Sequence, residues 1–177
     1  MLQETFLRMR QKFPIQDIYV STNEEYAAEV EKEILELPVE NIISEPMSRG
    51  SAASIALTTA VISARNGDDT VAFFPSDHLI KNPGLLVEAI TKGDEFLKSH
   101  KDYMITLGIN QTSPETGFGY IEKGEALDQG GGFEIFEAKR FVEKPDLATA
   151  QKYLESGNFF WNTAMYMYRV DYLIEKF

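Results

Sequence analysis

Short apolar runs typical of buried strands alternate with helical patterns along this chain, and that alternation restricts the folds it can adopt. Residues 70–75 are almost continuously apolar, as in a parallel strand that is buried on both faces. Further strands are predicted at residues 15–20, 39–44 and 103–109. Helices are predicted between them, at residues 24–37, 50–65 and 83–100. This order predicts an α/β fold, with a three-layer, doubly wound sheet.

A second pattern begins after residue 110. Two strands are predicted at 119–122 and 133–141, and the loop between them contains Gly130, Gly131 and Gly132. Asp146 is the candidate N-cap of a helix that ends at Gly157, with Leu147, Ala150 and Leu154 on one face. A long strand follows at 159–169. We therefore expect one domain with a mixed sheet over residues 1–177, in two parts, 1–110 and 111–177.

The two ends of the chain interrupt this pattern. Leu2, Phe6 and Met9 fall at helical spacing, so the chain begins inside a helix, whereas an α/β domain normally begins with a strand. The last predicted helix starts near Val170 and stops with the chain. We expect a larger domain cut at both ends and lacking its first strand; a natural short protein is the alternative. Backbone groups left unpaired by a missing strand predict marginal stability or association, as a homo-oligomer or with another chain.

The net charge disfavours some partners, and the cysteine content excludes some chemistry. The formal net charge is −11, which disfavours nucleic acids and anionic membranes because both need a basic surface. A small anionic ligand stays compatible, because a local basic cluster or a metal ion can reverse the field in one cleft. The chain has no cysteine, so disulfide and thiolate chemistry are excluded, and a cytoplasmic setting is expected.

One carboxylate follows the apolar run at 70–75. Asp77 comes two residues after that strand, and open α/β sheets bind ligands just beyond the carboxyl ends of their strands. A carboxylate there can hold Mg²⁺ against a triphosphate. The alternative is that Asp77 only caps a turn.

Other segments carry polar groups next to strand or helix ends. Glu45 and Arg49 precede the helix predicted at 50–65, whose first N–H groups can meet a polar ring or an anion. Glu143 and Lys144 follow a strand, where the first can bond sugar hydroxyls and the second can neutralise a phosphate. Gly119 lets the backbone approach a ligand closely. The alternatives are a helix cap with a surface arginine, a solvated strand end and an ordinary bulge.

Five motifs containing these residues occur in a fixed order. They are Glu45-Pro46-Met47-Ser48-Arg49, Pro75-Ser76-Asp77-His78, Glu115-Thr116-Gly117-Phe118-Gly119-Tyr120, Phe141-Val142-Glu143-Lys144-Pro145 and Trp161-Asn162-Thr163-Ala164-Met165. Together they resemble the sugar-1-phosphate nucleotidyltransferases, and most closely the mannose-1-phosphate guanylyltransferases. The resemblance covers essentially the whole chain. It implies a Rossmann-like nucleotide-diphospho-sugar transferase fold, with residues 1–110 as the nucleotide-binding part and 111–177 as the sugar-phosphate-binding part.

The resemblance also implies a reaction. A phosphate oxygen of mannose 1-phosphate attacks the α-phosphate of GTP, which forms GDP-mannose and releases pyrophosphate, with Mg²⁺ as cofactor. Asp77 is then the metal ligand, and Asp77 and Lys144 are the catalytic residues. The substrate-binding residues are Glu45, Arg49 and Ser51 on the nucleotide side, and Gly119, Glu143, Lys144 and Asn162 on the sugar-phosphate side.

The chain departs from the family pattern at several positions. Gly50, Ser51, Ala53 and Ser54 replace Asn, Thr, Pro and Ala, and Ala164 replaces Gly. The family's glycine-rich loop with its Arg and Lys does not occur in these residues, and Gly130–Gly132 lacks the Lys-Ser/Thr that follows a phosphate cradle. We therefore expect very weak or no turnover by this chain alone. The alternatives are a non-catalytic sugar-phosphate-binding or regulatory relative, and a nucleotidyltransferase for another hexose 1-phosphate or base.

Overall fold

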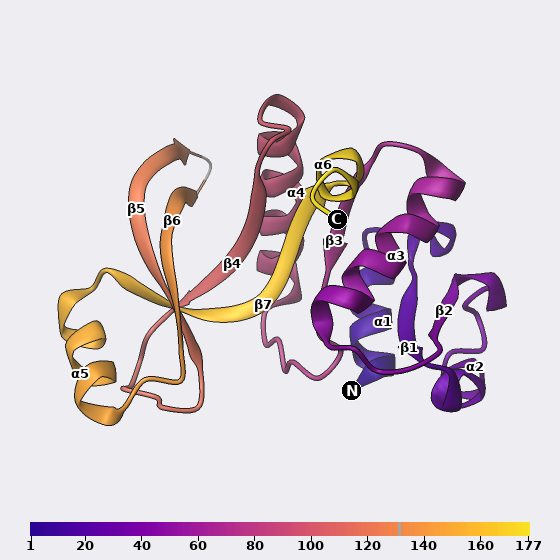
Figure 1. The fold of residues 1–177 in the computed structure, drawn as a ribbon, viewed down its shortest axis with the longest axis horizontal. Helices are drawn as coiled ribbons and strands as arrows, with labels where there is room; N and C mark the ends of the chain where they lie inside the picture. The colour runs from indigo at the N-terminus through magenta and orange to yellow at the C-terminus, as the bar shows by residue number, and fades with distance from the viewer. Residues whose placement is uncertain (131) are drawn as a thin grey trace. The chain divides into compact units, whose positions relative to one another are not determined.

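The computed structural model describes residues 1–130 and 132–177, and the chain forms two units (Figure 1). The first unit contains Met1–Tyr103 and Tyr168–Phe177, and the second contains Met104–Met167. The predicted α/β class is confirmed, because helices alternate with strands and the strand pairs include both parallel and antiparallel ones. The division into functional parts at residue 110 stays a prediction. Gly131, in the predicted glycine loop, lies outside the described residues.

The first unit carries most of the helices. They are α1 (Leu2–Arg10), α2 (Ala27–Glu33), α3 (Ser51–Asn66), α4 (Pro83–Ser99) and α6 (Val170–Ile174). The strands of this unit are β1 (Val20–Asn23), β2 (Ile42–Glu45) and β3 (Thr70–Phe73). Short 3-10 turns lie at Ile15–Asp17, Glu24–Tyr26 and Val39–Asn41. β1 and β2 are parallel, with a register that sets Asn23 opposite Glu45.

Local capping signals explain where the long helices begin and end. The Asn82 side chain accepts the backbone N–H of Leu85 at 3.1 Å, and Pro83 follows it at the first helical position of α4. Gly67 ends α3 with φ +76°, a conformation that side chains with a Cβ rarely adopt. The predicted limits of both helices are therefore confirmed to within a residue. α3 is buried only on the face that carries Ile55 and Ile62, so it is less buried than its composition predicts.

The strand predicted at 15–20 is wrong at its start. Residues Ile15–Asp17 form a 3-10 turn, and the strand begins only at Val20. The cause lies in a distant residue. The buried Asn41 side chain donates through Nδ2 to the carbonyls of Ile15, Gln16 and Ile18, at 3.4, 3.0 and 2.9 Å. These carbonyls are satisfied without a neighbouring strand, so the segment need not extend. The strand predicted at 39–44 likewise starts late, at Ile42.

The helix predicted at 24–37 is shorter than expected. Ser21, Thr22 and Asn23, which precede the predicted helix, belong to β1, and α2 runs only from Ala27 to Glu33. Ile34 leaves the helical conformation with φ −129° and ψ 74°. Its side chain and that of Leu37 are buried. Burial of these two side chains therefore decides where the helix stops, in place of intrinsic helix propensity.

The second unit is a sheet with one helix. Its elements are β4 (Met104–Asn110), β5 (Gly119–Gly130), β6 (Phe133–Glu143), α5 (Leu147–Ser156) and the first nine residues of β7 (Phe159–Arg169). β7 pairs with β4 and with β5, and β5 forms an antiparallel hairpin with β6 (Figure 1). β5 extends well beyond the predicted 119–122, because irregularities in its register let it follow β6 along the hairpin.

Helix α5 joins this sheet through aromatic residues. The Asp146 side chain caps α5 by accepting the N–H of Thr149 at 2.8 Å, and Gly157 ends it with φ +64°. Tyr153 stacks on Phe159 of β7, with 3.8 Å between the ring centroids. Ala150 is fully buried, but Leu147 is 62% exposed, so the predicted apolar face of the helix is wrong at its first residue.

A buried hydroxyl pair links α3 to the end of β7 within the first unit. Thr59 Oγ1 donates to the carbonyl of Ile55 at 2.7 Å, so the Tyr168 hydroxyl donates to Thr59 Oγ1 across 2.9 Å. Burial raises the pKa of the Tyr168 phenol. Within the described residues, no helix has both the length and the apolar character needed to cross a bilayer.

Candidate functional site

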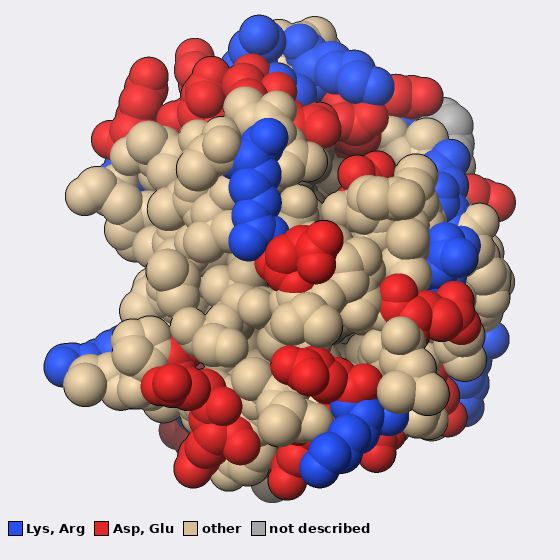
Figure 2. All heavy atoms as spheres, turned by 90° about the vertical axis from the view of Figure 1, so that its right-hand side faces the viewer, with Lys and Arg blue, Asp and Glu red and all other residues tan. Residues whose placement is uncertain are grey.

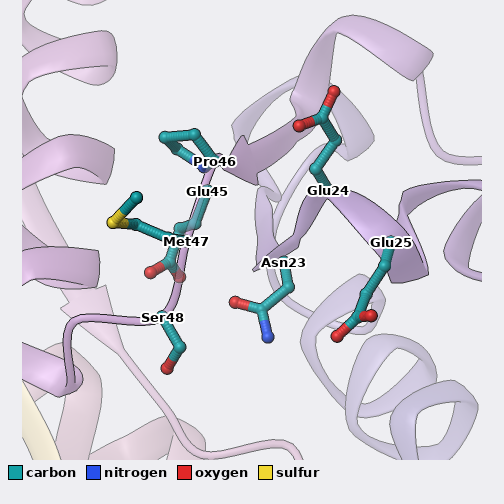
Figure 3. Close-up of a pocket in the computed structure, with 7 residues that line it drawn as sticks. All are labelled: Asn23, Glu24, Glu25, Glu45, Pro46, Met47 and Ser48. Atoms are coloured by element: carbon teal, nitrogen blue, oxygen red, sulfur yellow. The ribbon is translucent and has the colours of Figure 1, made fainter.

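A hollow of about 500 Å³ lies at the carboxyl ends of β1 and β2 (Figure 3). Its lining comes from two segments, Asn23, Glu24 and Glu25 after β1, and Glu45, Pro46, Met47 and Ser48 after β2. Parallel strands end at this edge, which is where open α/β sheets bind ligands. The structure thus places Glu45, a predicted substrate-binding residue, in the lining of this hollow.

The Glu45 side chain is fixed by a hydrogen bond. Ser21 Oγ of β1 donates to Glu45 Oε1 at 3.2 Å. Ser21 Oγ also lies 3.0 Å from Ser54 Oγ of α3. Three elements thereby determine the orientation of one carboxylate, which is half-buried. A carboxylate whose orientation is already fixed loses less side-chain entropy on binding a ligand than a freely rotating one.

The other predicted residues of this segment lie apart from the hollow. Arg49 is exposed, and its Nε lies 3.0 Å from the sulfur of Met47. Ser51 is the exposed first residue of α3. Gly50 precedes it with φ +82°, which explains why glycine suits the turn from β2 into α3. Arg49 and Ser51 keep their predicted role as a hypothesis.

Asp77 lies in a turn after β3 of the same unit. Helix α1 anchors this turn, because Thr5 Oγ1 donates to the Ser76 carbonyl at 3.1 Å. The Asp77 side chain is 78% exposed, and its Oδ1 lies 4.0 Å from His78 Nε2. In residues 1–130 and 132–177, no three His, Asp or Glu side chains gather as a metal site. A single exposed carboxylate suits Mg²⁺ that keeps its waters and arrives with phosphates.

Three predicted residues come together in the second unit. Gly119 is the register partner of Glu143 across the β5–β6 hairpin. A Cβ on Gly119 would lie 2.9 Å from Glu143 Oε2 and 3.5 Å from Asn162 Cβ. Because Gly119 has no side chain, the Glu143 carboxylate and the Asn162 amide lie next to its exposed backbone. Hydroxyl groups of a sugar can use both kinds of group.

Asn162 is oriented by its neighbours in this site. Its Oδ1 accepts the backbone N–H of Ala164 at 3.0 Å and lies 3.4 Å from Thr106 Oγ1 of β4. These contacts use the amide oxygen and leave the Nδ2 donors for another partner. Ala164 has φ +53°, and a strained alanine in mid-strand is a feature of functional sites.

Lys144 directly follows β6 and has an unusual backbone conformation. Its φ is +44°, and its N–H donates to the Phe118 carbonyl at 3.2 Å. Its Nζ lies 3.3 Å from Glu143 Oε1, and both side chains are largely exposed. The two opposite charges predicted at this strand end are thus adjacent and open to solvent. Such a cation can meet a phosphate without first leaving a buried ion pair.

The predicted site residues divide between the two units. Glu45, Arg49, Ser51 and Asp77 lie in the first, and Gly119, Glu143, Lys144 and Asn162 lie in the second. Sequence motifs did not identify Ser21, Asn23 or Thr106. Asn23 comes just before two glutamates at the end of a strand, and this polar cluster could have indicated a site residue. The sequence around Ser21 and Thr106 contains no such indication.

Surface charge is mixed on the face that Figure 2 shows. Acidic side chains are spread over this face, and basic side chains lie between them. This distribution accords with the net charge of −11. The absence of a nucleic-acid partner stays a prediction.

Known proteins resemble this chain in sequence. The family model for nucleotidyl transferases matches residues 1–176. A mannose-1-phosphate guanylyltransferase from Klebsiella pneumoniae is 37% identical, and one from Escherichia coli is 36% identical, each over 99% of this chain. The aligned part makes up 37% of each relative. The chain therefore spans little more than a third of the length of these relatives.

Solved structures share the fold. A protein from Thermus thermophilus, described as a mannose-1-phosphate geranyltransferase, superposes with a TM-score of 0.82 and 24% identity, over 98% of this chain and 48% of that one. A protein from Helicobacter pylori, described as a mannose-6-phosphate isomerase, gives a TM-score of 0.78 and 26% identity, over 98% of this chain and 63% of that one. The predicted Rossmann-like fold is confirmed by these neighbours.

Proposed function

Since this chain belongs to the nucleotidyl transferase family, we propose that it serves the transfer of GMP from GTP to mannose 1-phosphate, which yields GDP-mannose and pyrophosphate. The bond that forms joins a phosphate oxygen of the sugar phosphate to the α-phosphorus of GTP. The bond that breaks joins that phosphorus to the oxygen bridging to the β-phosphate. No covalent enzyme intermediate is needed, so the protein acts by positioning its substrates and neutralising their charge.

The observation that carries this proposal is the arrangement around Gly119. Glu143 and Asn162 face the same bare backbone, and Lys144 follows directly with its ammonium group exposed. A sugar phosphate offers hydroxyls and an anion, which match a carboxylate, an amide and a cation. We assign Glu143 and Asn162 to the hydroxyls and Lys144 to the phosphate.

The first unit supplies the nucleotide side in this proposal. Glu45 meets the base in the hollow after β2, with Arg49 and Ser51 near the start of α3. Asp77 would hold a Mg²⁺ ion that arrives with the triphosphate, and this ion would supply charge neutralisation at the phosphates. We place the protein in the cytoplasm, because GTP and sugar phosphates are cytoplasmic metabolites.

The first experiment measures binding of mannose 1-phosphate to the purified chain by amide chemical shifts. We expect the largest shifts at Gly119, Lys144 and Asn162. Glu143→Gln should weaken binding by about tenfold, the effect of one charge-assisted hydrogen bond. Glu137→Gln is the matched control, because this exposed glutamate lies on the same strand β6. Unchanged binding in Glu143→Gln, or shifts confined to other residues, would contradict the assignment.

Turnover tests the reaction itself. With GTP, mannose 1-phosphate and Mg²⁺, we expect very weak or no release of pyrophosphate by these 177 residues, which contain no glycine-rich Arg/Lys loop. Fast GDP-mannose formation would contradict the need for that loop. Binding of the sugar phosphate with no turnover, even after a phosphate-binding loop is supplied as a fusion, would favour the non-catalytic, sugar-phosphate-binding alternative.

A further inference from the structure

Strand β7 changes its backbone conformation at Ala164, two residues after Asn162. Ala164 has φ +53°, whereas a residue in an extended strand has a φ of about −120° to −140°. The N–H of Ala164 donates to Asn162 Oδ1 at 3.0 Å, and the N–H of Met165 donates to Thr163 Oγ1 at 3.3 Å. Two successive side chains thus accept backbone donors two residues further along the chain, as Asn and Thr side chains do in turns.

Strand β4, which pairs with β7, contacts this turn through two adjacent residues. The carbonyl of Leu107 accepts the hydroxyl of the buried Thr163 at 2.7 Å. The hydroxyl of Thr106 donates to Asn162 Oδ1 at 3.4 Å. The second distance is long for a hydroxyl donor, so Thr106 adds a modest restraint to the stronger bond from Ala164. Asn162 is therefore held from β4 as well as from its own strand.

These donors fix which end of the Asn162 amide faces the site. A backbone N–H can only donate, so the amide atom that it meets is Oδ1. Nδ2 then lies on the other side, 3.8 Å from the position that a Cβ on Gly119 would take, and Glu143 Oε2 lies 2.9 Å from the same position. The site therefore presents a donor from Asn162 beside an acceptor from Glu143.

One sugar hydroxyl can use both groups at once. A hydroxyl has one proton to donate and lone pairs that accept. It can donate its proton to the Glu143 carboxylate while its oxygen accepts from Asn162 Nδ2. If the amide turned by half a rotation, Oδ1 would lie beside the carboxylate, so two acceptors would compete for one proton and the hydroxyl oxygen would lose its donor. The orientation of the amide therefore determines how well the site binds a hydroxyl.

We propose that Thr106 is a positioning residue of this site, and that its hydroxyl keeps the Asn162 amide turned with Nδ2 toward the ligand. The amide torsion of asparagine is broad and roughly two-fold, so each donor to Oδ1 adds to the preference for one of the two positions. This inference rests on the proposed function, and it adds a residue of β4 that belongs to none of the five motifs.

The test compares Thr106→Val, which removes the hydroxyl and keeps the shape of the side chain, with Thr106→Ser, which keeps the hydroxyl. Calorimetric titration of the purified chain with mannose 1-phosphate gives each affinity. We expect Thr106→Val to weaken binding about threefold, the effect of one weak hydrogen bond, and Thr106→Ser to bind like the parent. Thr106→Ala is a second variant without the hydroxyl, for use if Thr106→Val does not fold.

The side-chain amide signals of Asn162 in a nitrogen–proton spectrum report on its orientation without any ligand. We expect Thr106→Val to shift and broaden these signals and Thr106→Ser to restore them. Thr112→Val is the matched control, because Thr112 is exposed and lies shortly after the same strand. It should leave both the amide signals and the affinity for mannose 1-phosphate unchanged.

A double-mutant cycle separates an action through Asn162 from other effects. Thr106→Val should not weaken binding further in a chain that already carries Asn162→Ala. Equal weakening in both backgrounds, or parent-like affinity and amide signals in Thr106→Val, would overturn the inference. If Asn162→Ala itself binds mannose 1-phosphate like the parent, the proposed function fails together with the inference. If Asn162→Ala weakens binding and Thr106→Val does not, only the inference fails.

Discussion

The Asn162 amide oxygen accepts the backbone N–H of Ala164 at 3.0 Å. This hydrogen bond spans two residues, and within it Ala164 has φ +53°. The same hydrogen bond orients Asn162 and strains its neighbour. Left-handed backbone conformations cost a residue with a Cβ about 1–2 kcal/mol, and glycine adopts them freely. The strain is thus linked to the orientation of a proposed sugar-binding residue.

Replacing Ala164 by glycine should stabilise the protein. The relief of strain exceeds the extra entropy of glycine in the unfolded chain, so we expect a gain of about 0.5–1 kcal/mol in the free energy of unfolding. Urea denaturation measures this change. Ala138→Gly is the control, because this exposed alanine of β6 has no positive φ and its replacement should destabilise. A loss of stability in Ala164→Gly would show that the observed φ is not strained.

Adding a methyl group at Gly119 should impair ligand binding more than folding. Its Cβ would approach Glu143 Oε2 to 2.9 Å, and the flexible carboxylate can move away at little cost in stability. That movement displaces a proposed hydroxyl ligand, so we expect Gly119→Ala to weaken mannose 1-phosphate binding by about tenfold or more. Calorimetric titration gives the affinity. Gly117→Ala is the matched control, because a Cβ there meets no atom within 4 Å; equal affinities in both variants would contradict the prediction.

Removing the Asn41 amide should destabilise the first unit. Asn41→Ala leaves the carbonyls of Ile15, Gln16 and Ile18 without their donor. We expect a loss of about 2–3 kcal/mol in the free energy of unfolding, since the Ile18 bond is buried. Chemical denaturation measures the loss. The exposed Asn110 supplies the control Asn110→Ala, which should change stability by less than about 0.5 kcal/mol.

Acid should weaken the ion pair that Asp68 forms with Arg169. The Arg169 guanidinium hydrogen-bonds the Asp68 carboxylate and lowers the pKa of that carboxyl. A pKa lowered in the folded state gives stability that is present above the unfolded pKa, which is about 3.9. That stability is lost as the pH falls through the lower folded pKa.

The measurement is the melting temperature between about pH 2 and pH 7. Asp68→Asn should lower it at neutral pH and should show a smaller fall below about pH 4. Asp17→Asn is the control, because Asp17 is exposed and forms no ion pair in the described part of the chain. If the melting temperatures of the parent and of Asp68→Asn change in parallel with pH, the ion pair does not cause the loss of stability in acid.

The open edge of β1 predicts association. Among the described strands, β1 pairs with β2 alone, which leaves backbone groups of Val20 to Asn23 without a second strand. Unpaired edges favour contact with another chain. We expect light scattering to detect oligomers, or melting to be weakly cooperative. A monomer with a cooperative melt above roughly 60 °C, the upper range for ordinary domains, would contradict this expectation.

Local signals allowed much of the fold to be predicted. The ends of α3, α4 and α5 follow from Gly67, Asn82 and Asp146, because caps act within one helical turn. The start of β1 was wrong because Asn41, over twenty residues away, supplies its hydrogen bonds. Long-range partners of this kind have no signature in the segment that they reshape.

In the candidate site, too, residues in local motifs could be predicted, and residues that depend on long-range contacts could not. Motifs predicted Glu45, Glu143 and Asn162 as site residues, since these residues carry charges and amides that can bind a substrate. Ser21 and Ser54 were missed, because a hydroxyl on a strand and another on a helix gain a role only when the fold brings them within 3.0 Å.

The first unit is discontinuous in sequence, since it needs both Met1–Tyr103 and Tyr168–Phe177. Tyr168 bonds Thr59, and Arg169 bonds Thr70 and Asp68. During synthesis, the ribosome releases these partners only after the whole second unit has been made. The second unit is continuous and can fold first, whereas the first must wait with its helices incompletely packed. Contacts over about a hundred residues also slow folding, so we expect the order of folding to be the reverse of the order of translation.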